Sequence, residues 1–124
     1  MEAQAGFGKA RRLLHSGEFK AVFRQGRRYS LPNLTMVFLK RRSQGEQPLG
    51  PRLGLSISKK VGSSPQRNQL KRRLREVFRL QAKAFHPMDM VVVGRPESTA
   101  LDYGGLRQAF LDLCGRAKAL KEGA

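Results

Sequence analysis

The stretch from Arg67 to Arg79 combines a stripe of apolar positions with a stripe of cations. At about 100° per residue, four apolar residues fall on one side of a helix. These are Leu70, Leu74, Val77 and Phe78. An adjoining stripe holds Asn68, Lys71, Arg72, Arg75 and Arg79. The pattern predicts a helix that buries one face and presents cations on the next. Ser63 or Ser64 as N-cap and Pro65 in the first turn predict its start near Ser64.

Helical spacing also occurs near both ends of the chain. Ser16 as N-cap and Gly26 as a left-handed stop predict a short first helix. On this helix one face holds Phe19, Val22 and Phe23. Asp102 predicts the start of a last helix, and its apolar stripe consists of Leu106, Phe110, Leu113, Cys114 and Ala117. We expect the chain to fray from Lys118.

Four stretches have the composition of β-strands. They are residues 27–31, 34–41, 52–58 and 89–95. The second and third alternate between two faces, and in the third the second face is small and weakly polar (Gly54, Ser56 and Ser58). The fourth is a continuous apolar run, which predicts a strand buried on both faces in the centre of a sheet. Pro32-Asn33 predicts a turn, and residues 43–51 are expected to form the tip of an antiparallel hairpin.

The composition points to a polyanionic partner. The chain has 124 residues and a formal net charge of +16, with 25 cations against 9 acids. We expect a flexible basic arm over residues 1–10, a single domain over 11–120 and a frayed tail over 121–124. The chain lacks both an apolar run long enough to span a membrane and a signal-peptide pattern. These features favour a soluble cytoplasmic protein.

Side chains with catalytic chemistry are sparse. His15 and His86 are isolated in the sequence, the acids are scattered, and there is no glycine-rich motif of the Walker type. Cys114 is the only cysteine, and its place on an apolar helical face predicts a core residue. The sequence therefore favours binding without catalysis by protein side chains. Phe19 and Phe23 have two interpretations, core packing or a surface on which unpaired bases stack, and both can hold at an open groove.

Five motifs resemble the protein subunit of bacterial ribonuclease P. They are RLLHSGEFKAVFRQG (residues 12–26), LGLSISKKVG (53–62), RNQLKRRLRE (67–76), MVVVGRP (90–96) and LDYGGLR (101–107). The resemblance implies an α+β fold, an α-β-β-β-α-β-α two-layer sandwich with a left-handed βαβ crossover (ribosomal-protein-S5-like). General rules of chain connection would instead predict a right-handed crossover.

The resemblance also implies a function and a set of site residues. The family's RNA subunit is the catalyst and uses Mg²⁺ to remove the 5′ leader from precursor tRNA, while the protein binds that RNA and the single-stranded leader. RNA contacts would fall on Arg67, Asn68, Lys71, Arg72 and Arg75, with support from Arg12, Lys59 and Lys60. A leader groove would fall on Phe19, Phe23, Thr35, Val37 and Ser56. The implied partners are the catalytic RNA and precursor tRNA, with no membrane and no obligate protein partner.

Two positions depart from the family pattern. Gln69 stands where the family usually has an arginine, and Val37 stands where an aromatic residue is often found. Two other functions stay open: a ribosomal or other assembly protein, and an RNA-cleaving enzyme acting through His15 or His86.

Overall fold

The computed structural model describes residues 16–40 and 50–121, and it has the predicted order of elements. In chain order they are α1 (Ser16–Gln25), β1 (Arg27–Leu31), β2 (Leu34–Lys40), β3 (Arg52–Ser56), α2 (Ser64–Gln81), β4 (Met88–Val93) and α3 (Tyr103–Arg116). Three short 3-10 turns lie between these elements: η3 (Lys59–Val61) before α2, η4 (Ala82–Ala84) before β4, and η5 (Pro96–Ala100) before α3. The α-β-β-β-α-β-α prediction is confirmed.

The four strands form one mixed sheet in the order β1-β2-β4-β3. β2 is antiparallel to both β1 and β4, and β3 is parallel to β4. The hairpin expected between the second and third strands is therefore wrong, because β4 lies between β2 and β3. The continuous apolar run of β4 explains this order, since a strand buried on both faces is most stable with a neighbour on each side.

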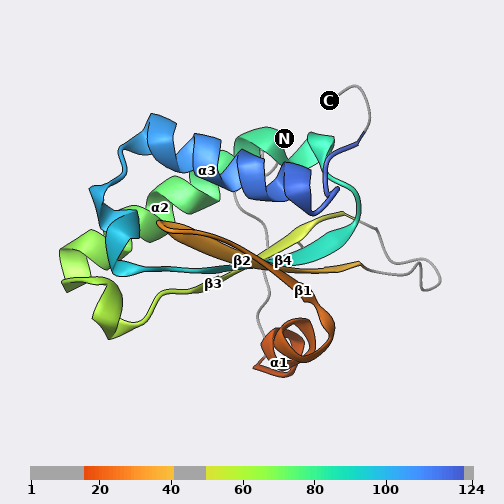
Figure 1. Cartoon of the computed structure of the whole chain (residues 1–124), viewed down its shortest axis with the longest axis horizontal. Helices are drawn as coiled ribbons and strands as arrows, with labels where there is room; N and C mark the ends of the chain where they lie inside the picture. Colours follow the sequence, from red (N-terminus) through yellow and green to blue (C-terminus); the bar gives the residue numbers. More distant parts are fainter. Residues whose placement is uncertain (1–15, 41–49, 122–124) are drawn as a thin grey trace, which may run out of the picture.

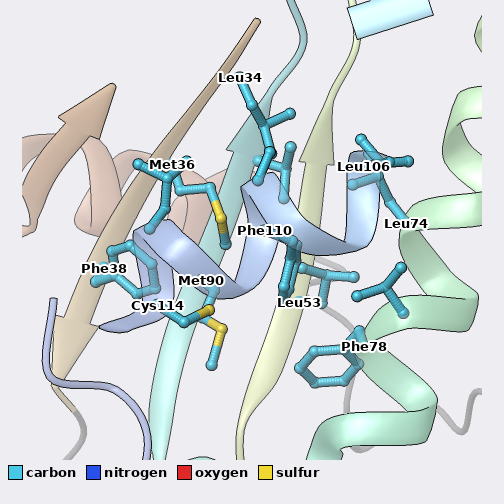
Figure 2. Close-up of a cluster of buried hydrophobic side chains, with 14 of the residues drawn as sticks. Leu34, Met36, Phe38, Leu53, Leu74, Phe78, Met90, Leu106, Phe110 and Cys114 are labelled. Atoms are coloured by element: carbon cyan, nitrogen blue, oxygen red, sulfur yellow. The ribbon is translucent and has the colours of Figure 1, made fainter. Parts of the chain in front are cut away.

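The β3–α2–β4 connection is left-handed. Figure 2 shows β3 (yellow) and β4 (cyan) pointing the same way, with α3 in front of the sheet and β4 to the left of β3. The resemblance implied this hand, against the general preference for right-handed crossovers.

The main core lies between the sheet and the pair α2 and α3, which cover the same face (Figure 1). The predicted stripe of α2 is buried there, as are Leu106, Phe110, Leu113 and Cys114 of α3. The sheet contributes the face of β2 that holds Leu34, Met36 and Phe38, together with Leu53 and Met90 (Figure 2). Strand alternation thus decides which residues meet the two helices.

α1 covers part of the opposite face of the sheet (Figure 1). Val22 is fully buried against Val37 and Val91. Phe19, Leu39 and Val93 are partly buried around them. The alternate residues of β2 and β4 therefore form a second, smaller core under α1.

Gly26 ends α1 for a reason different from the one predicted. Its backbone is not left-handed; its N–H donates to the Val22 carbonyl over 2.8 Å as in a continuing helix. A Cβ atom at Gly26 would lie 2.5 Å from the Val22 oxygen and 2.7 Å from the Phe38 oxygen. Glycine is needed here because α1 passes close to the backbone of β2.

The prediction that the chain frays from Lys118 is wrong for residues 118–120. Ala119 is fully buried, and its carbonyl accepts a hydrogen bond from the His86 N–H over 2.8 Å. Lys121 donates its N–H to the Ala84 carbonyl over 2.7 Å. Lys118 makes this turn possible by adopting a left-handed conformation with φ of 56°. The expected arm over 1–10 and residues 122–124 lie outside the described residues.

Candidate nucleic-acid interface

The start of α2 is fixed by a reciprocal pair of hydrogen bonds. Ser63 is the N-cap: its hydroxyl accepts from the Gln66 N–H over 3.3 Å, and its own N–H donates to Gln66 Oε1 over 2.9 Å. Pro65 lies in the first turn, as predicted. The cap sets where the helix begins, and with it the direction of every cation that follows.

The six cations of α2 divide into two groups. Arg73 donates to the Leu101 carbonyl over 3.0 Å, Arg79 pairs with Glu76 at 2.6 Å, and Arg67 donates to the Gly62 carbonyl over 3.1 Å. The other group is Lys71, Arg72 and Arg75. No hydrogen bond or ion pair joins the side chains of these three to any other residue among 16–40 and 50–121.

The three cations without a partner lie where the sequence placed them. Arg72 and Arg75 are exposed, Lys71 is half-buried, and Asn68, which is exposed, lies on the same stripe. Their positions follow from the buried residues of the neighbouring stripe, which turn this side of α2 away from the core. The result is a cationic stripe on which Arg79 pairs with Glu76, while the charges of Lys71, Arg72 and Arg75 are not neutralised within the described part of the molecule.

A row of small and aliphatic residues crosses the sheet on the α1 face. Ser30, Thr35, Val93 and Ser56 are aligned in register from β1 through β2 and β4 to β3. Ser30 and Thr35 are joined by their hydroxyls at 3.0 Å. Val93 and Ser56 are half-buried, whereas Thr35 is only 2% exposed. Ser30 is exposed, so the row offers accessible surface at both its β1 end and its β3 end.

The two aromatic residues of α1 differ in exposure. Phe19 is half-buried and packs against the small core under α1, while Phe23 is 39% exposed. Val37, predicted to lie in the groove, is 2% exposed and supports α1 from below. The structure thus brings Phe19 and Val37 together, and it leaves Phe23 and Ser56 with more accessible surface.

Lys59 and Lys60 lie between this row and the cationic stripe. Both are exposed in the 3-10 turn η3, which leads from the end of β3 to the start of α2. This places two further cations on the route from Ser56 to the stripe. Arg12 lies outside the described residues.

A cluster of three charged residues was missed by the sequence analysis. Arg52 donates from Nε and Nη2 to the two carboxylate oxygens of Asp89, each over 2.8 Å, and from Nη1 to Glu18 of α1. The hydrogen bonds to Asp89 raise the pKa of the Arg52 guanidinium, against an opposing effect of burial. The sequence did contain a signal for this cluster. Arg52 begins one predicted apolar strand, and Asp89 begins another.

Metal-ligating side chains do not gather in the described residues. Within residues 16–40 and 50–121, no group of three His, Cys, Asp or Glu side chains could hold a metal ion. His86 is exposed and His15 lies outside these ranges. No helix in the same part of the chain is long and apolar enough to cross a membrane.

Comparison with known proteins links this geometry to one family. The family model described as Ribonuclease P matches residues 7–118. Among curated proteins, the ribonuclease P protein component of Finegoldia magna is 32% identical over 114 residues, covering 91% of this chain and 96% of that protein. The protein of the same description from Exiguobacterium is 36% identical over 110 residues, covering 89% and 92%.

Solved structures agree with the fold. The RNase P protein of Staphylococcus aureus superposes with a TM-score of 0.80 at 22% identity, covering 91% of this chain and 100% of that one. The RNase P protein of Thermotoga maritima gives a TM-score of 0.72 at 28% identity, covering 85% and 96%.

Proposed function

Since this chain belongs to the ribonuclease P protein family, and is thus a subunit of a ribonucleoprotein enzyme of tRNA processing, we propose that it uses two surfaces in that enzyme. The first, for the catalytic RNA, consists of Arg67, Asn68, Lys71, Arg72 and Arg75, with Arg12, Lys59 and Lys60 in support. The second, for the single-stranded 5′ leader of precursor tRNA, consists of Phe19, Phe23, Thr35, Val37 and Ser56.

The observation that carries the first assignment is the state of the cations on α2. The side chains of Lys71, Arg72 and Arg75 have no partner among the described residues, whereas those of Arg67, Arg73 and Arg79 form contacts within the fold. Phosphates of RNA would neutralise the three and release counterions. Gln69, the departure from the family pattern, is exposed beside the stripe, and it offers an amide where an arginine would add a charge.

The second assignment is supported by the form of the α1 face. Phe23 has exposed ring surface, and Ser56 closes a row of small side chains over which a nucleotide backbone can pass. Stacking on an aromatic side chain contributes about 1–3 kcal/mol per base. Because Thr35 and Val37 are nearly buried, their part is to support the row and α1, while the direct contacts fall to Phe19, Phe23 and Ser56.

The chemistry in this proposal belongs to the RNA. We place Mg²⁺ on the RNA subunit, where it would supply the Lewis-acid chemistry for hydrolysis of the phosphodiester at the leader junction. The protein's cations lower the repulsion between RNA phosphates that approach one another, which favours both assembly and Mg²⁺ occupancy. The protein supplies no proton donor or nucleophile in this scheme.

The test is cleavage of a precursor tRNA at physiological Mg²⁺ by the protein alone, by a bacterial ribonuclease P RNA alone, and by both. Efficient cleavage at the leader junction only by the mixture supports the proposal. If the protein adds nothing to the RNA, its assignment to this reaction is wrong and a place in ribosome assembly becomes the better hypothesis. Cleavage by the protein alone would contradict our expectation that its side chains are not catalytic.

A further inference from the structure

Helix α1 is held against the sheet by different contacts at its two ends. At its carboxyl end, Gly26 approaches the Phe38 carbonyl too closely for any side chain. Near its amino end, Glu18 accepts a hydrogen bond from Arg52 of β3. Between the two, Val22 is the only fully buried residue of the helix. A ten-residue helix is marginal by itself, so these contacts determine how α1 lies on the sheet.

The contact at the amino end is part of a chain of charges that reaches the centre of the sheet. Asp89 of β4 is 5% exposed, and its carboxylate is bound by two parallel hydrogen bonds from Arg52. Arg52 is thereby fixed in one orientation, with Nη1 directed to Glu18. The link runs from the central strand through the edge strand to α1, and a forked guanidinium is suited to join two carboxylates in this way.

We propose that Glu18 is a positioning residue for leader recognition. Through Arg52 and Asp89 it sets the place of the first turn of α1, and therefore of Phe19, the next residue along the chain. The inference rests on the proposed leader groove and adds a part of it that makes no contact with RNA itself. An aromatic ring held in advance costs less conformational entropy when a base stacks on it.

Replacing Glu18 separates two explanations, because they predict opposite changes in the affinity for RNA. Glu18→Gln removes an acid from a protein that binds RNA, so charge alone predicts tighter binding of every RNA. Positioning predicts weaker binding of substrates that have a leader. The hydrogen bonds between Arg52 and the buried Asp89 do not involve Glu18, so this variant leaves them in place.

The experiment uses the holoenzyme reconstituted with ribonuclease P RNA. The dissociation constant is measured for precursor tRNA with a long leader and for the same tRNA with a one-nucleotide leader, together with the affinity of the protein for the RNA subunit. We expect Glu18→Gln to reduce the preference for the long leader about fivefold, the equivalent of about 1 kcal/mol of stacking, with the affinity for the RNA subunit no weaker than in the parent.

Two further variants complete the test. Asp112→Asn gives the same change of charge in an exposed pair with Arg116 on α3, and we expect the preference for the long leader to be unchanged. Glu18→Asp keeps the charge but shortens the side chain, and we expect an intermediate loss. The inference is overturned if Glu18→Gln and Asp112→Asn behave alike, or if Glu18→Gln weakens both substrates equally. A parent protein with no preference for the long leader would instead refute the leader groove itself.

Discussion

Arg52 and Asp89 join the two parallel strands of the sheet through a pair of matched hydrogen bonds. The residues are direct neighbours in the register of β3 and β4, and both N···O distances are 2.8 Å. Asp89 is only 5% exposed, so water cannot replace Arg52 as its partner. The pair therefore stabilises a carboxylate inside the sheet by two charge-assisted hydrogen bonds.

The first prediction follows from that dependence. Arg52→Ala removes the two hydrogen bonds that the guanidinium donates to the buried Asp89 carboxylate, and we expect it to lower the free energy of unfolding by about 3 kcal/mol. Denaturant unfolding would measure the loss. The control is Arg79→Ala, which breaks a partly exposed pair with Glu76 and should cost clearly less. Equal losses in the two variants would show that the Arg52–Asp89 pair is not essential to the fold.

A second prediction compares two glycines of the α1 region. A methyl group at Gly26 would meet the carbonyl oxygens of Val22 and Phe38 at 2.5 and 2.7 Å, whereas nothing lies within 4 Å of one at Gly17. We expect Gly26→Ala to destabilise the protein by about 2 kcal/mol through overpacking. Gly17→Ala should stabilise it by about 0.5 kcal/mol, because alanine loses less backbone entropy in a helix. Thermal unfolding would compare both with the parent, and a stable Gly26→Ala protein would contradict the close approach.

The helices and strands could be predicted from the sequence because their signals are local. The Ser63 cap lies within three residues of Gln66, and the buried stripe of α2 follows from the helical period. The strand order could not be predicted in the same way. Nothing local shows that β4 pairs with β2, a strand about fifty residues earlier, and the general preference for adjacent pairing suggested the hairpin instead.

For the candidate site, too, the sequence predicted the local pattern but not the tertiary contacts. The stripe with Lys71, Arg72 and Arg75 was identified, but the sequence could not show which cations the fold would use. Arg73 binds the Leu101 carbonyl, 28 residues further along the chain. Arg52 and Asp89 are 37 residues apart and meet only because β3 and β4 are neighbours. Such contacts depend on tertiary register, and single-sequence periodicity contains no information on it.

The third prediction concerns the salt dependence of RNA binding. If Lys71 and Arg75 contact phosphates, Lys71→Ala and Arg75→Ala should each weaken binding to ribonuclease P RNA. Each should also reduce the slope of log K against log salt concentration by about one. Arg107→Ala on α3 removes the same charge from an exposed position outside the stripe, and its slope should stay close to that of the parent. Equal slopes for all three variants and the parent would rule out direct phosphate contacts by this stripe.

The last prediction uses the buried thiol of Cys114. Burial raises the pKa of Cys114 far above its ordinary value, which in an unfolded chain is about 8.5. Below that pH the thiol is protonated in both states, and its contribution to stability is complete. Above it the unfolded chain releases a proton that the folded protein keeps, so unfolding becomes more favourable as the pH rises. At one unit above the unfolded pKa the loss should reach about 1.4 kcal/mol.

Cys114→Ala removes that titration while its cavity cost does not change with pH. The difference in unfolding free energy between parent and variant should therefore be constant up to about pH 8 and then shrink towards higher pH. Chemical denaturation at a series of pH values under reducing conditions measures it. Parallel curves for the two proteins would mean that the thiol ionises in the folded state, and that the interior between α3 and the sheet admits water.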